Sequence, residues 1–156
     1  MATIHRVRRK KAFHSIAVSA FVQGTEDESK VATAFRLIVP ENVRIDRQPV
    51  TGHFGNAIVV LKAQTGEAQE IRQVIDAIRN KLSKRDLMQL RRQVPQYLSE
   101  RCTLVMKFNK QTAACGALEL GRNDPIVVRA RIAAYPARVE IAVEIARNVL
   151  NNECIC

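Results

Sequence analysis

In the stretch FHSIAVSAFV, residues 13–22, Ser15 and Ser19 alternate with the apolar residues Ile16, Val18 and Ala20. A period of two is typical of a β-strand that buries one face and exposes the other. We therefore expect a strand here, and the rest of the fold can be worked out from it.

A helix is predicted directly after this strand. Residues 25–28, TEDE, match a capping box, in which Thr25 accepts a hydrogen bond from a first-turn amide and Glu28 reaches back to a second one. Apolar side chains at Val31 and Phe35 mark its inner face, and the helix is expected to end at Pro40.

The middle of the chain predicts a hairpin and then the clearest helix. Strands are expected at residues 43–50 and 57–63, joined by a loop that contains two glycines. Residues 67–82 follow with an apolar stripe at helical spacing, which consists of Ile71, Val74, Ile75, Ile78 and Leu82.

The remaining elements alternate strand and helix. A second capping box at Ser83 predicts a short helix to about Gln93, which Pro95 ends. Beyond it we expect strands at residues 102–108 and 126–133, a turn at residues 109–116 and a last helix at residues 137–150.

This order of elements predicts a single α+β domain. Its sheet is expected to be mixed or antiparallel, with helices packed mainly on one face. The domain spans residues 12–150, between a basic flexible arm at residues 1–11 and a tail at residues 151–156. The oligomeric state stays open, and a dimer is compatible with the pattern.

Charge is the strongest global feature. The chain has 25 Lys and Arg against 15 Asp and Glu, a net charge of +10 and a pI near 10.0. Such an excess attracts polyanions, of which nucleic acid is the commonest in cells. The alternative is an organism whose proteins are generally basic. No secretory signal or membrane-length apolar run is present, so we expect a cytoplasmic protein without a membrane partner.

The four cysteines form no CxxC pair. Cys102 and Cys115 are interpreted as small core residues, and Cys154 and Cys156 as a reduced tail. We therefore expect neither a metal site nor another cofactor.

The loop at residues 51–56 is the first candidate binding segment. His53, Phe54 and Asn56 offer a hydrogen-bonding ring, a stacking ring and an amide, the groups that recognise an unstacked RNA base. The alternative is a hairpin turn in which Phe54 is tucked inward.

Two further groups are cationic. Lys107, Lys110 and Gln111 follow one another near a strand end, where Lys110 and Gln111 are candidates to hold a phosphate and a base edge, although such residues are more often merely solvated. Arg129 and Arg131 are two apart on a predicted strand and share a face, which suits phosphate binding. Cross-strand salt bridges are the equally open alternative.

Accessory contacts would come from the arm and from one helix. These basic residues contribute affinity without specificity, and they are Arg6, Arg8, Arg9, Lys10, Lys11, Lys84, Arg85, Arg91 and Arg92.

Catalytic motifs are absent from the sequence. There is no GxxxxGK[ST], HExxH or GxSxG segment, and His5, His14 and His53 are scattered. We therefore expect a protein that is not an enzyme.

Several segments occur together in a characteristic order: Phe13-His14, Thr25-Glu26-Asp27-Glu28, Gly52-His53-Phe54-Gly55-Asn56, Lys110-Gln111 with Gly116 beyond, and Ala133-Ala134-Tyr135-Pro136. Over residues 12–150 the chain resembles the archaeal RNA-binding domain family described as predicted exosome subunits. The resemblance implies a fold similar to the ribosomal protein that binds 5S RNA. It also implies RNA binding at His53, Asn56, Lys110 and Gln111, and association with the exosome.

The leading hypothesis is thus an RNA-binding protein of RNA processing, RNA degradation or ribosome biogenesis. The alternative is a subunit that docks onto an RNA-processing complex and contacts little RNA itself. RNA binding predicts basic residues that converge on one face, whereas docking predicts an exposed apolar patch.

Overall fold

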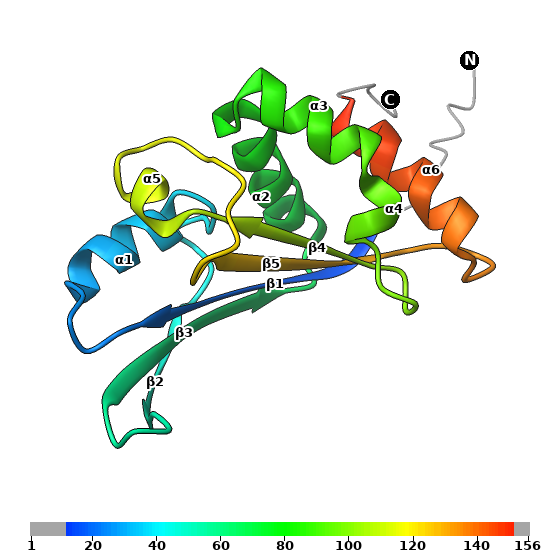
Figure 1. Ribbon diagram of the computed structural model, residues 1–156. Helices are drawn as coiled ribbons and strands as arrows, with labels where there is room; N and C mark the ends of the chain where they lie inside the picture. Colours follow the sequence, from blue (N-terminus) through cyan, green and yellow to red (C-terminus); the bar gives the residue numbers. More distant parts are fainter. Residues whose placement is uncertain (1–11, 152–156) are drawn as a thin grey trace, which may run out of the picture.

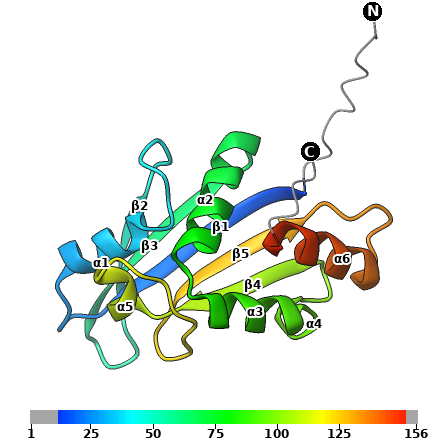
Figure 2. The ribbon, with the colours of Figure 1, turned by 90° about the horizontal axis from the view of Figure 1, so that it is seen from above.

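The computed structural model describes residues 12–151. Its centre is one five-stranded sheet with the strand order β2-β3-β1-β5-β4. Every pair of neighbouring strands is antiparallel. Figures 1 and 2 show the helices on one side of this sheet, with the other side uncovered. The predicted α+β architecture is therefore confirmed, while the likeness to the ribosomal protein stays a prediction.

The strand β1 occupies the middle of the sheet; the alternation in its sequence predicts the strand itself. It pairs with β3 on one side and with β5 on the other, and its register shifts between Phe13 and Ser15. The strands are β1 (Phe13–Val22), β2 (Asp46–Thr51), β3 (Ala57–Thr65), β4 (Thr103–Phe108) and β5 (Ile126–Ile132).

The helices form a single layer over one face of the sheet (Figure 2). Within this layer α5 packs against α1, and α3 and α4 pack against α6. The helices are α1 (Glu28–Arg36), α2 (Ala68–Lys81), α3 (Lys84–Arg92), α4 (Val94–Tyr97), α5 (Lys110–Ala114) and α6 (Val139–Leu150). None of the helices in residues 12–151 has the length and apolar character needed to cross a membrane.

The core lies between the sheet and the helix layer. Alternate strand residues point into it, such as Phe108 and Val128, and both are fully buried. Phe35 of α1 and Ile78 of α2 belong to the same buried cluster and are equally buried. Each such side chain contributes about 1.5–3 kcal/mol relative to an exposed one. The strand residues between them point to the other face of the sheet, toward solvent.

The first helix begins later than the capping box predicted. Asp27, not Thr25, is its N-cap, and the Asp27 carboxylate accepts from the Ser29 amide at 3.0 Å. The hydrogen bonds from the Ser29 hydroxyl and amide hold the pKa of Asp27 below its usual value. The second predicted cap is confirmed, since the Ser83 hydroxyl accepts from the Asp86 amide at 3.1 Å.

Three local predictions are wrong. The predicted turn at residues 109–116 contains helix α5, because the Asn109 side chain caps it by accepting from the Thr112 amide at 3.1 Å. Strand β2 starts at Asp46, since residues 40–43 are held in a turn. Cys102 is buried as expected, but Cys115 is exposed.

Candidate nucleic-acid interface

The uncovered side of the sheet, here called the open face, carries side chains from all five strands. The antiparallel register arranges them in rows that cross the strands. One row reads Asp46, Lys62, Ser19, Val127 and Lys107, the next reads Gln64, Ala17, Arg129 and Val105, and the third reads Ser15, Arg131 and Thr103.

Four cations stand in these three rows: Lys62, Lys107, Arg129 and Arg131, which we call the basic quartet. All four are exposed. They come from β3, β4 and β5, so the fold converges residues that are far apart in the sequence. Neighbouring strands are about 4.8 Å apart and alternate residues of one strand about 6.7 Å. Lys107, Arg129 and Arg131 therefore lie close together on β4 and β5, and Lys62 lies across β1 on the same face.

The quartet has no acidic partner within the described chain. The ion pairs of residues 12–151 involve other cations, and Asp46, the acid in the first row, pairs with Arg44 at 3.2 Å. The alternative of cross-strand salt bridges for Arg129 and Arg131 is therefore wrong. Like charges held together without a counter-charge favour an external anion.

The neighbours of the quartet are short. Ser15, Ala17 and Ser19 run along the central strand between Lys62 on one side and the arginines on the other. Such small side chains do not reach over the guanidinium groups. The open face therefore leaves five N–H donors of each arginine free for an elongated anion.

The loop at residues 52–56 is a tight hairpin turn. The Gly55 amide donates to the Gly52 carbonyl at 3.0 Å, and the Gly52 amide donates to the Asn56 carbonyl at 2.7 Å. Gly55 has a φ of 77°, a conformation that favours glycine. A Cβ at Gly52 would lie 2.3 Å from the Asn56 Oδ1, so the Asn56 side chain occupies the space that this glycine leaves.

Phe54 points into solvent at the tip of this turn. Its side chain is 91% exposed, so the inward-tucked alternative is wrong. His53 contacts it edge-on, with ring centroids 5.1 Å apart and an interplanar angle of 80°. Five residues of β3 separate the turn from Lys62, about 17 Å of strand. The aromatic tip and the basic quartet are thus separate parts of the surface.

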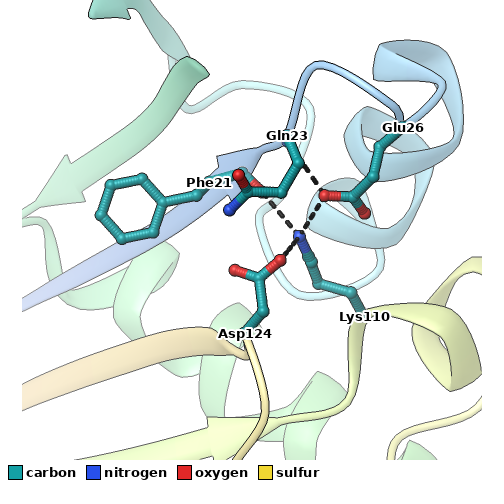
Figure 3. A network of polar contacts seen from close by, with 5 residues as sticks. All are labelled: Phe21, Gln23, Glu26, Lys110 and Asp124. Carbon is teal, nitrogen blue, oxygen red and sulfur yellow. Dashed lines mark hydrogen bonds and ion pairs between the residues drawn. The ribbon is translucent and has the colours of Figure 1, made fainter. Parts of the chain in front are cut away.

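Lys110 does not reach the open face, contrary to the prediction that it holds a phosphate. Only 7% of the residue is exposed. Its ammonium donates to the Phe21 carbonyl at 2.7 Å, to Glu26 Oε1 at 2.8 Å and to Asp124 Oδ2 at 2.6 Å (Figure 3). All three N–H groups have acceptors inside the protein, so this lysine is structural.

Glu26, one of the acidic partners of Lys110, has a shifted pKa. Partial burial alone raises the pKa of Glu26, but hydrogen bonds from Lys110 and the Gln23 amide, with the ammonium charge, outweigh that effect. The pKa of Glu26 therefore lies below its usual value. The cluster ties α5 to the end of β1 and to the start of β5.

The other predicted contacts lie in the helix layer. Gln111 is exposed on α5, and Lys84, Arg85 and Arg92 are exposed on α3. Arg85, Arg92 and half-buried Arg91 of α3, with exposed Arg147 of α6, are among the residues that line two shallow hollows of about 370 and 530 Å³. Figure 1 shows α3 on the far side of the sheet from the open face. The arm residues from Arg6 to Lys11 lie outside the described residues.

Two features of this surface were missed from the sequence. Lys62 belongs to the quartet, although the apolar residues around it in β3 give no sign of a binding position. His14 and Tyr135 meet across 121 residues of chain, with the Tyr135 hydroxyl 3.1 Å from His14 Nε2. The alternation of Lys62 with Gln64 would have indicated that Lys62 faces solvent. No local pattern in the sequence indicates the contact between His14 and Tyr135. Residues 12–151 contain no cluster of His, Cys, Asp and Glu suited to a metal ion.

Comparison with known proteins gives one family. A family model described as RNA binding matches residues 15–132. The RNA-binding protein PAB1135 of Pyrococcus abyssi is 30% identical over 146 residues, which cover 90% of this chain and 95% of that protein.

Solved structures show the same architecture. Protein AF2318 from Archaeglobus fulgidus, a DUF54 structure, superposes with a TM-score of 0.79 at 28% identity, covering 88% of this chain and 99% of that one. The DUF54 protein Mth689 from Methanothermobacter thermautotrophicus gives a TM-score of 0.75 at 29% identity, covering 88% and 98%.

Proposed function

Because the chain belongs to the family described as RNA binding, we propose that it binds RNA and that the open face of its sheet is the binding surface. The basic quartet holds the phosphate backbone, and no chemical step on the RNA is part of the proposal. One observation carries it: four exposed cations share one sheet face without an acidic partner among the described residues.

Backbone binding accounts for this chemistry better than base recognition does. Guanidinium and ammonium groups bind phosphate oxygens through charge-assisted hydrogen bonds, and released counterions add a favourable entropy. Contacts of this kind orient an RNA on the surface but carry no sequence information. The protein is thus proposed to recognise RNA mainly by charge and shape.

The cellular setting is a further part of the proposal. We place the protein in RNA processing or degradation with the exosome, or in ribosome biogenesis, in the cytoplasm. The family resemblance supports this, and the 91% exposed ring of Phe54 gives the hairpin a contact point for a protein of such an assembly.

A salt series tests the binding surface. The wild type and an Arg129→Ala/Arg131→Ala variant are titrated with a labelled structured RNA and a matched duplex DNA. Each phosphate contact contributes about 0.7–0.9 to the slope of log K against log salt, so the variant is expected to lose about 1.4–1.8.

An Arg72→Ala/Lys81→Ala variant is the matched control. Both residues are exposed on α2, so the change of net charge is the same but the open face is intact. Equal losses in the two variants would mean that only overall charge matters. If only deletion of residues 1–11 lowers the affinity, the folded domain is not the RNA-binding part and the docking alternative takes its place.

A further inference from the structure

His14 and Tyr135 form an exposed aromatic pair that the basic quartet does not explain. Tyr135 is 75% exposed, and His14 is exposed as well. Their ring centroids are 5.6 Å apart, with an interplanar angle of 84°. One ring comes from the start of β1 and the other from the segment between β5 and α6, so the fold itself assembles the pair.

The strand register places this pair beside the basic quartet. Phe13 lies opposite Ile132 and Ser15 opposite Arg131, so His14 is the extra residue of a bulge. In a bulge two residues of one strand face a single residue of the other, and His14 lies next to Ser15, the residue that pairs with Arg131. An imidazole, a phenol and a guanidinium thus share one corner of the open face.

The contact leaves the tyrosine ring available. It runs through the phenol oxygen, which lies 3.1 Å from His14 Nε2 at the edge of both rings. Because His14 meets Tyr135 edge-on, it cannot lie flat over the tyrosine ring, and the residue stays 75% exposed. The hydrogen bond restricts the motion of the ring, so less side-chain entropy is lost when a flat ligand stacks on it.

We propose that this corner binds an unpaired nucleobase, stacked on Tyr135, with the adjoining phosphate on Arg131. The inference rests on the proposed function, because the quartet must first hold the RNA backbone. Stacking on an aromatic face tolerates every base, and paired bases inside a helix are not accessible to it. The protein then prefers RNA that has a single-stranded nucleotide next to a duplex over a blunt duplex.

Intrinsic fluorescence gives a direct readout, because the chain has no Trp and only two Tyr. Replacing the other tyrosine, Tyr97→Phe, leaves Tyr135 as the sole strong emitter. The probes are one RNA stem with a three-nucleotide overhang and the same stem blunt-ended. We expect the overhang RNA to quench the emission and to bind more tightly, and the blunt RNA to leave the emission nearly unchanged.

Substitutions separate the ring from its hydroxyl. Tyr135→Leu is expected to weaken binding of the overhang RNA by about 5- to 160-fold, the range for loss of one stacked base, and to leave blunt binding unchanged. Tyr135→Phe keeps the ring and retains most of the preference for the overhang. Thermal unfolding of each variant shows whether the fold is kept, and an overhang labelled with 2-aminopurine reports stacking independently of the protein.

The failures are distinguishable. If both RNAs bind the wild type equally and lose affinity together in Arg129→Ala/Arg131→Ala, the proposed function stands and the stacking site is refuted. Equal weakening of both RNAs by Tyr135→Leu refutes the site as well. If the wild type binds neither RNA, the proposed function fails and the inference fails with it.

Discussion

Replacing Lys110 by methionine tests the assignment of this lysine to the protein interior. Methionine keeps an unbranched apolar stem but removes the charge and the three hydrogen bonds to Phe21, Glu26 and Asp124. The variant is therefore expected to lose stability and to keep its RNA affinity.

The size of the loss follows from the burial of the partners. Removing one member of a fully buried pair costs about 3–5 kcal/mol, whereas an exposed pair contributes about 0–1 kcal/mol. Only 7% of the Lys110 side chain is exposed, but Glu26 and Asp124 are 28% and 37% exposed, so water can rehydrate the abandoned carboxylates. We expect a free energy of unfolding lower by about 2–3 kcal/mol.

Urea denaturation followed by circular dichroism measures this change, and Lys107→Met is the matched control. Lys107 lies in β4, only a few residues before Lys110, yet it is exposed on the open face. Its substitution is expected to change stability by less than about 0.5 kcal/mol and to lower the salt slope of RNA binding by about 0.7–0.9.

The two variants should therefore show opposite effects. The assignment is refuted if Lys110→Met stays within about 0.5 kcal/mol of the wild type and lowers the salt slope instead. The triple variant Lys110→Met/Glu26→Gln/Asp124→Asn should recover part of the lost stability, because it also removes the two unpaired carboxylates.

Three further outcomes are expected. The pKa of Glu26 is lower in the folded protein than its ordinary value of 4.5. Its contribution to stability is therefore complete above pH 4.5 and is lost as the pH falls through the lower, folded-state pKa. Acid unfolding of Glu26→Gln should show a smaller loss of stability in that range than the wild type does. Gly55→Ala should cost about 1–2 kcal/mol in urea denaturation, because φ at this position is positive, and Gly55→Asn should cost clearly less. Ser83→Ala removes the cap of α3 and should lower the free energy of unfolding by about 1 kcal/mol, whereas an unchanged value would show that the Asp86 amide needs no partner.

Elements with a strong period were predictable from the sequence. The alternation at residues 13–22 gave strand β1 with its bounds, and the apolar stripe at residues 67–82 gave α2 to within a residue at each end. The short helix α5 was missed, because five residues show no measurable period and only Asn109 marks its start.

The part of the candidate interface that lies on a single strand was predictable from the sequence. Arg129 and Arg131 share a face because alternate residues of a strand always do, and the register then adds Lys107. The burial of Lys110 was not predictable, since its partner Glu26 is 84 residues away. A solitary lysine looks the same in a sequence whether water or a carboxylate accepts its hydrogen bonds.

The position of β1 in the middle of the sheet also determines when the molecule can be completed during its synthesis. Ile16 pairs with Ala130, so one edge of β1 stays unpaired until Ala130 has been synthesised. At about 5–20 residues per second this interval lasts roughly 6–20 s. During that time β1 can join β3 but exposes an unpaired edge on its other side. An unpaired strand edge can pair with another chain, so this edge of β1 is where association of unfinished chains would begin.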